Sequence, residues 1–276
     1  MSFPTLAGID FTSRPTKRKP ITVALGSSDG ASVRLVRLDR HASFDGFAAW
    51  LRTPGPWLGA FDFPFGLPRE LVETLGWPCE WLPLMRHYAA LTREEIRATF
   101  AAFCDARPVG GKFAHRACDV PAGSSPSMKW VNPPVAYMLH AGMPLLIDAG
   151  VHLPGLHAGD ASRVALEAYP GLLARELIGN RSYKSDEVAK QTPERLIARK
   201  DLIEALGQGR TRLGLRLRLT HAQRDALAAD ASGDELDAVL CLVQAAWAAR
   251  EPGFGVPADV DPLEGWIVSA GSPAPS

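Results

Sequence analysis

Three short apolar segments of this chain each carry a single acidic side chain, and each reads as a buried β-strand. The acids are Asp10, Asp62 and Glu167, in segments 6–11, 57–63 and 163–168. Burying an unpaired carboxylate is costly, so such groups are normally ion-paired, hydrogen-bonded or bound to a metal ion. One acid at a strand end often caps a loop, but three in separate strands favour a shared site.

The order of the elements predicts an α/β fold with a mixed five-stranded sheet flanked by helices. Strands are expected at 6–11, 21–25, 33–38, 57–63 and 163–168, and helices at 43–52, 69–75, 171–178, from 192 onward and at 233–249. The first three strands are joined by short connections, which suggests an antiparallel meander. The resulting order is β-β-β-α-β-α-β-α, followed by the two late helices.

Residues 76–160 give a weaker pattern because prolines and glycines are frequent there. Helical patterns occur only near 92–103 and 134–141, so we interpret this region as an insertion or lid. We expect a single domain over residues 1–270 and a disordered tail over 271–276.

A parallel arrangement of the three acid-bearing strands would bring their C-terminal ends to one edge of the sheet. Ligands bind outside that edge in open α/β sheets. Carboxylates that converge there repel one another unless a cation lies between them. Oxygen-only ligation favours Mg²⁺ or Mn²⁺ over zinc.

The helix expected over residues 233–249 supplies further acids. Ser232 and Glu235 fit a capping box, and Asp234 complements the helix dipole. Asp237 lies beyond the first turn, at the head of a small apolar stripe formed by Cys241, Ala245 and Ala248. We therefore predict Asp237 as a metal ligand, with Asp234 able to assist from the same face.

Two groups of basic residues are candidate substrate contacts. Arg14 belongs to a basic loop directly after the first strand, where it could follow a phosphate backbone. The second group could clamp a nucleotide by charge and stacking, and consists of Lys112, His115, Arg116, Lys129 and Trp130. Ordinary surface or structural roles stay open for both groups.

Composition narrows the partners and the compartment. Thirty basic residues balance thirty acidic ones, so no net field favours a polyanion or a membrane. The N-terminus lacks a signal-peptide pattern, and no apolar run approaches the about 20 residues that span a bilayer. We expect a cytoplasmic protein whose four cysteines are reduced thiols. The single H-x-x-C pair of His115 and Cys118 is weak support for zinc.

Several motifs resemble a known superfamily. The element order, with acids on the first and fourth strands and on a late helix, resembles the ribonuclease H-like superfamily. The D-x-x-D-A run at 234–238 is similar to the late acidic helix of Holliday-junction resolvases. A closer resemblance is to the uncharacterised bacterial family called domain of unknown function 429, described as predicted nucleases with a ribonuclease H fold. The motifs that carry it are GIDF (8–11), FDFPFGLP (61–68), EAYP (167–170), Tyr183-Lys184, DELDA (234–238) and EGW (264–266).

This resemblance implies a metal-dependent nuclease or phosphodiesterase that acts on a nucleic acid or a nucleotide. Two Mg²⁺ or Mn²⁺ ions would promote in-line attack by water on the phosphodiester. The implied ligands are Asp10, Asp62 and Asp237, with Glu167 or Asp234 completing the set. Lys184 would neutralise charge on the scissile phosphate, although an exposed loop lysine without that role is equally compatible.

Two other functions stay open. An actin-like nucleotide-binding phosphotransferase shares the β-β-β-α-β-α core, but Phe11 after Asp10 would obstruct close phosphate approach. The chain also lacks a clear second glycine-rich phosphate loop. A non-catalytic binding protein that retains the acidic site is the other alternative, and metal titration separates it from the enzymes. The oligomeric state is not specified.

Overall fold

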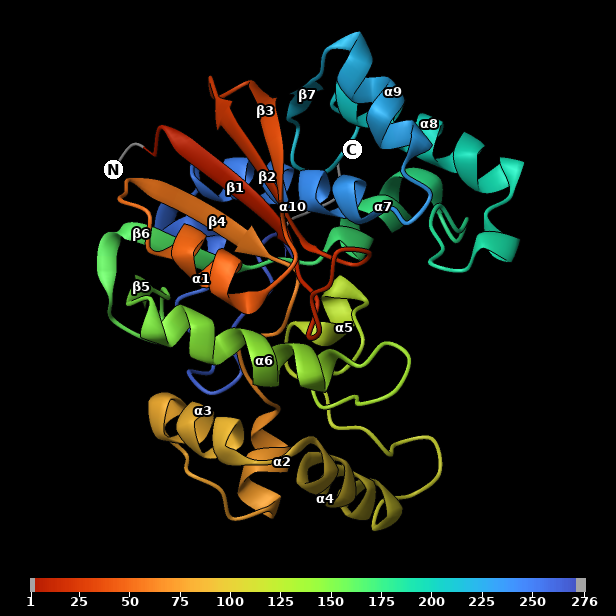
Figure 1. Ribbon diagram of the computed structural model, residues 1–276. Coiled ribbons are helices and arrows are strands. Elements are labelled where there is room, and N and C mark those ends of the chain that lie inside the picture. The colour runs from red at the N-terminus through yellow and green to blue at the C-terminus, as the bar shows by residue number, and fades with distance from the viewer. Residues whose placement is uncertain (1–2, 272–276) are drawn as a thin grey trace.

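The computed structural model describes residues 3–271, and within them one mixed sheet has seven strands in the order β5-β6-β4-β1-β2-β3-β7 (Figure 1). The strands are β1 (Thr5–Asp10), β2 (Ile21–Ser28), β3 (Ser32–His41), β4 (Trp57–Phe61), β5 (Val151–His152), β6 (Asp160–Glu167) and β7 (Arg216–Arg218). β1, β2 and β3 form the expected antiparallel meander, whereas β4 and β6 run parallel to β1. The predicted α/β class with a mixed sheet is confirmed.

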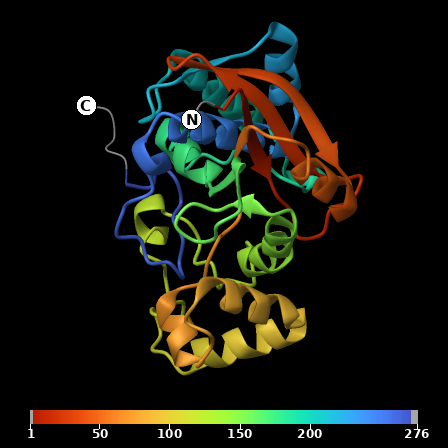
Figure 2. The same cartoon turned by 90° about the vertical axis from the view of Figure 1, so that its left-hand side faces the viewer.

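Helices cover both faces of this sheet (Figures 1 and 2). They are α1 (Phe44–Leu51), α2 (Arg69–Thr74), α3 (Trp81–Ala90), α4 (Arg93–Asp105), α5 (Asp119–Ala122), α6 (Val135–Asp148), α7 (Pro170–Ile178), α8 (Pro193–Gln208), α9 (His221–Ala229) and α10 (Asp234–Ala248), with short 3₁₀ helices η1 (Val188–Lys190) and η2 (Pro252–Gly255). One hydrophobic cluster joins one face of the sheet to α1 and α6, and a second joins the other face to α7, α8, α9 and α10.

Strand alternation decides which side chains face α10. On β1, Leu6 belongs to the cluster on the α10 side, and Ala7 and Ile9 belong to the cluster on the opposite side. On β4, Leu58 and Ala60 lie on the α10 side. Because side chains alternate along a strand, the acids at positions 10 and 62 continue the α10 side of their strands.

Helix α10 packs directly on β1 at Gly8. A Cβ atom at this position would lie far inside van der Waals contact with the Ala238 carbonyl oxygen and the Leu242 amide nitrogen. These are backbone atoms and cannot rotate away. Glycine at position 8 therefore sets the distance between the end of β1 and the first turns of α10.

We expect Gly8→Ala to lower the free energy of unfolding by about 1–3 kcal/mol, because the added methyl group overpacks a closed interface. Urea denaturation measures this loss. Gly46→Ala in α1 is the matched control, since its new Cβ would approach no atom closer than 3.5 Å. The control is expected to be neutral or slightly stabilising. Equal stability of the two variants would contradict close packing at Gly8.

Residues 76–160 supply α3 to α6 and β5. Helices α2, α3 and α4 lie together at one end of the molecule, and α6 lies between them and the sheet (Figures 1 and 2). A single hydrophobic cluster contains Ile9 of β1, Leu139 of α6 and Phe100 of α4, all fully buried. This region therefore shares one core with the sheet.

The sheet is larger than the five strands that the sequence predicts. The additional strands β5 and β7 have two and three residues, too few to produce a visible alternation. The pattern also missed α3, which contains Pro83 in its first turn, and α9, in which only Leu227 and Ala228 are buried. The helix expected near 134–141 continues to Asp148.

The predicted disordered tail falls almost entirely on residues 272–276, which lie outside the described residues. Among residues 3–271, no helix is both long enough and apolar enough to cross a lipid bilayer.

Candidate metal centre

Asp10, Asp62 and Asp237 converge at the carboxyl edge of the sheet. Asp10 is the last residue of β1, and Asp62 directly follows β4, with its amide donating to the Ile9 carbonyl at 2.9 Å. Asp237 lies in the first turn of α10, which packs on both strands. One carboxylate oxygen from each residue lies within 4.8 Å of the others. The structure therefore brings together the three acids predicted as metal ligands.

Two of these carboxylates have no hydrogen-bond or ion-pair partner within residues 3–271. Asp10 is 7% exposed, and no hydrogen bond or ion pair reaches the carboxylate of Asp10 or Asp62 from any residue in the 3–271 range. Burial, together with repulsion from Asp237 and Asp234, raises the pKa of Asp10 well above its ordinary value. Burial and the neighbouring Asp237 raise the pKa of Asp62 to about 7. The nearby Lys184 ammonium lowers both pKa values but only partly offsets burial and the neighbouring carboxylates.

Asp237 is held by Tyr183 and Lys184, two adjacent residues of the loop that follows α7. The Tyr183 hydroxyl donates to Oδ1 of Asp237, and the Lys184 ammonium donates to Oδ2. Burial alone would lower the pKa of Lys184, but the surrounding groups, led by Asp237 and including Asp10 and Asp62, together raise that pKa. Tyr183 was not predicted as a site residue; its only signal was its place in the Tyr183-Lys184 motif.

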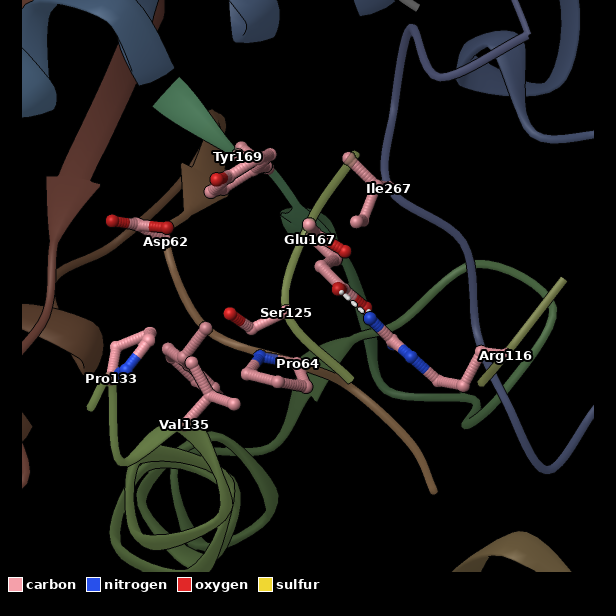
Figure 3. A pocket seen from close by; sticks show the side chains of 12 residues that line it. Asp62, Pro64, Arg116, Ser125, Pro133, Val135, Glu167, Tyr169 and Ile267 are labelled. Carbon is pink, nitrogen blue, oxygen red and sulfur yellow. Dashed lines mark hydrogen bonds and ion pairs between the residues drawn. The ribbon is translucent and has the colours of Figure 1, made fainter. Parts of the chain in front are cut away.

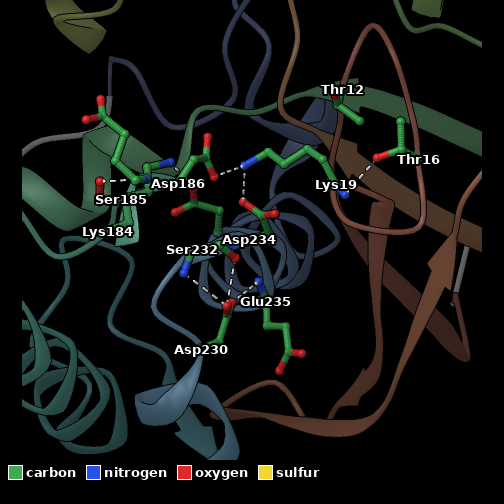
Figure 4. A network of polar contacts seen from close by, with 12 residues as sticks. Thr12, Thr16, Lys19, Lys184, Ser185, Asp186, Asp230, Ser232, Asp234 and Glu235 are labelled. Carbon is green, nitrogen blue, oxygen red and sulfur yellow. Dashed lines mark hydrogen bonds and ion pairs between the residues drawn. The ribbon is translucent and has the colours of Figure 1, made fainter. Parts of the chain in front are cut away.

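Asp234 lies beside this group rather than in it. Its carboxylate accepts from the Lys19 ammonium at 2.7 Å, and Lys19 also contacts Asp186 at 2.8 Å (Figure 4). The predicted ligand Asp234 is thus neutralised by a lysine from the loop after β1. The surrounding charges, above all Asp186 and Asp234, raise the pKa of Lys19 despite partial burial.

The capping box expected from Ser232 and Glu235 is wrong. The N-cap position of α10 is Gly233, which has a φ of 77° and no side chain to offer. Asp230 takes the capping role by accepting from the Ser232 hydroxyl at 2.7 Å and from the Glu235 amide at 3.0 Å (Figure 4). The Glu235 side chain instead pairs with Arg40.

Glu167 points to the opposite face of the sheet from Asp62. Its backbone pairs with Phe61, whose ring belongs to the cluster on the α1 and α6 side. The Glu167 carboxylate accepts two bonds of 2.7 Å from Arg116 (Figure 3). It also accepts one bond of 2.9 Å from the Phe65 amide. The predicted catalytic residue Glu167 is therefore satisfied by protein groups and does not belong to the carboxylate triad.

Arg116 was predicted as a substrate contact, and the structure instead places it in the interior. It is 2% exposed, and a guanidinium has five N–H donors. All five are used, by Glu167 twice, by Asp119 at 3.2 and 2.9 Å, and by the Glu264 carbonyl at 3.0 Å. No donor remains for a phosphate.

The other five predicted substrate residues belong to the loop after β1 and to the lid region. Arg14, Lys112 and His115 are exposed, and Lys129 is half-buried. Trp130 packs against Phe113 and Phe100 in the hydrophobic cluster of the lid region. None of the five is among the residues that line the groove above the triad.

An open groove of about 680 Å³ leads to the carboxylates. Its walls come from four segments: the loop after β1, the start of α6, the start of α7 and the loop from Gly179 to Asp186. Among its lining residues are four cationic side chains, which are Lys19, Arg175, Arg181 and Lys184. The groove thus places acids and bases side by side at the sheet edge.

Comparisons of the chain with protein-family models, with curated proteins and with solved structures found no match. A functional proposal therefore rests on the geometry and chemistry of this site.

Proposed function

We propose that the chain is a ribonuclease H-like phosphodiester hydrolase that uses Mg²⁺ or Mn²⁺ held by Asp10, Asp62 and Asp237. The observation that carries the proposal is the buried carboxylate of Asp10, which has no donor among residues 3–271 and faces two further carboxylates. Like charges this close raise each other's pKa unless a cation offsets them. A divalent ion is the simplest group that relieves the repulsion.

The donor set fits such an ion. All three groups offer carboxylate oxygen, which Mg²⁺ and Mn²⁺ prefer, and no thiolate or imidazole belongs to the triad. A bound ion would supply charge stabilisation for the phosphoryl group under attack. The chain itself orients this centre, because Tyr183 and Lys184 fix both oxygens of Asp237. Lys184 would also neutralise charge on the phosphate.

The element order supports the ribonuclease H-like part of the proposal. Strands β1, β2 and β3 are followed by α1, β4 and α2, and then by β6 and α7. This succession of elements follows the β-β-β-α-β-α-β-α order when two features are left out. They are the short edge strands β5 and β7, and the helices α3 to α6 between α2 and β6.

A cleavage screen tests the proposal. Chelator-treated protein is supplied with Mn²⁺ or Mg²⁺ and incubated with single-stranded, duplex and branched nucleic acids, and with a dinucleotide. We expect metal-dependent release of shorter products. Isothermal titration calorimetry that detects no binding of either ion would contradict the proposal, and so would ATP hydrolysis without any phosphodiester cleavage.

Metal affinity is expected to depend on pH through Asp62. Its pKa of about 7 stands above the ordinary value of 3.8, so between these limits the folded protein holds a proton that the unfolded chain has released. The metal-free protein therefore loses stability as pH rises through this range. Metal binding displaces the proton, so Mn²⁺ affinity should rise about tenfold from pH 6 to pH 8. Calorimetry in two buffers of different ionisation enthalpy measures the affinity and the released proton; a flat profile would contradict this.

A further inference from the structure

The carboxylates of the triad lie at the floor of the groove rather than on an open surface. Asp237 is fully buried and Asp10 is 7% exposed. Asp10 and Asp62 line the groove, and the loop that carries Lys184 and Asp186 forms one of its walls. A scissile phosphate must therefore enter the groove to reach the triad.

The size of the groove suits a small ligand. Its volume is about 680 Å³. The volume falls within the range of pockets that bury a small molecule. One or two unpaired nucleotides fit this space.

The chemistry of the walls suits an unpaired nucleotide. The segment from Pro133 to Met138 contributes only apolar side chains to the groove, whereas the loop from Gly179 to Asp186 contributes Arg181 and Lys184. A smaller, mainly apolar cavity of about 60 Å³ shares Asp62, Val135 and Tyr169 with the groove, and Tyr169 lies in it on the far side from Val135 (Figure 3). Apolar and aromatic side chains accept the face of a base, and cations accept its phosphate.

The chain as a whole carries no net positive charge that would attract a long duplex. Its basic and acidic residues are equal in number, and tight binding of duplex DNA depends on neutralising many phosphates. The cations of the groove are also partly used within the protein. Lys19 and Lys184 pair with Asp234 and Asp237, and Arg181 pairs with Asp201. Among residues 3–271, Arg175 has no carboxylate partner, so the positive charge left for a ligand suits about one phosphate.

We infer that the groove takes one or two unpaired nucleotides, with a phosphodiester at the triad and a base against the apolar segment from Pro133 to Met138. The substrate class is then a dinucleotide or a flexible single strand, and not a duplex. This inference rests on the proposed function and narrows it.

Binding of labelled oligonucleotides tests the inference without requiring turnover. The full chain is titrated in Ca²⁺, an ion that also takes oxygen ligands. The probes are a fluorescein-labelled four-nucleotide thymidine oligomer and a blunt twelve-base-pair duplex with the same label, and fluorescence anisotropy gives both affinities. We expect the oligomer to bind at least about tenfold more tightly. Equal or tighter binding of the duplex would overturn the inference, and so would the absence of binding by both.

A bulky residue at position 135 locates the binding site. Val135 lines both cavities but offers no atom to the triad, so Val135→Trp should weaken oligomer binding at least about tenfold and leave Mn²⁺ affinity unchanged. Val131→Trp is the matched control, because Val131 is 50% exposed and lies outside both cavities. If Val135→Trp unfolds, Pro134→Trp at the exposed groove rim replaces it.

The outcomes separate the two proposals. Unchanged oligomer binding in a folded position-135 or position-134 variant would overturn the groove as the nucleotide site. If the unmodified protein does not bind Mn²⁺, that result would instead contradict the metal-dependent function.

Discussion

Replacing Asp10 with asparagine is expected to abolish metal-dependent cleavage while it stabilises the metal-free fold. The substitution removes one of the three negatively charged carboxylates that form the triad. Substitution of residues that only hydrogen-bond to metal ligands lowers metal affinity or activity about 10–100-fold. Loss of a ligand itself should therefore lower kcat/KM more than about 100-fold. The same change removes the burial cost and the repulsion that raise the pKa of Asp10, so the melting temperature in chelator should rise by about 2 °C or more.

Two measurements on one variant make this expectation specific. Differential scanning calorimetry with chelator and with Mn²⁺ gives the stability of each form, and the wild-type increase on adding Mn²⁺ should vanish in Asp10→Asn. Asp148→Asn is the matched control, because Asp148 is exposed at the C-terminal end of α6 and no triad residue lies on that helix. Full cleavage activity in Asp10→Asn would rule out the mechanism.

Convergence of the triad could be predicted because it depends on short-range patterns. Asp10 and Asp62 end neighbouring strands, and parallel pairing places both ends at one edge. Asp237 heads a fully buried small-residue stripe on α10, so its place on the sheet follows from helical spacing. In each case the informative residues lie within a few positions of the acid.

Glu167 has the same local sequence pattern but a different environment. Which face it occupies depends on the register between β4 and β6, where Phe61 lies opposite Glu167. A shift of one residue in that register would move every side chain of β6 to the other face. The apolar run around Glu167 does not encode this register, so its grouping with the triad could not be tested from the sequence.

The partners of the site residues were the least predictable part. Lys19 and Asp234 are 215 residues apart, and Tyr183 and Asp237 are 54 apart. These contacts join irregular loops to a helix terminus, and such loops carry no hydrophobic period. The sequence therefore indicated the acids of the site but not the donors that hold them.

Replacing Arg116 with alanine is expected to destabilise the fold by about 3–5 kcal/mol. The change removes five donors at once and leaves Glu167 and Asp119 buried with uncompensated charge. Arg116→Lys should recover little, because an ammonium has three donors and lacks the planar fork that holds Glu167 by two bonds. Urea denaturation of both variants gives the loss in unfolding free energy.

An exposed arginine provides the comparison. The side chain of Arg37 is 62% exposed and pairs with Asp39 at 3.0 Å, so Arg37→Ala should cost less than about 1 kcal/mol. A similarly small cost for Arg116→Ala would contradict the role of the buried network.

The Arg116 network should also affect the metal centre from a distance. Glu167 accepts from the Phe65 amide, and Phe65 lies three positions after Asp62 on the segment that leaves β4. Release of Glu167 frees this segment, so a folded Arg116→Lys protein should bind Mn²⁺ less tightly although Arg116 contacts no triad residue. Calorimetric titration of this variant with Mn²⁺ separates the two roles. Unchanged affinity would mean that the network stabilises only the core. Reduced affinity would mean that the network also positions Asp62 in the metal site.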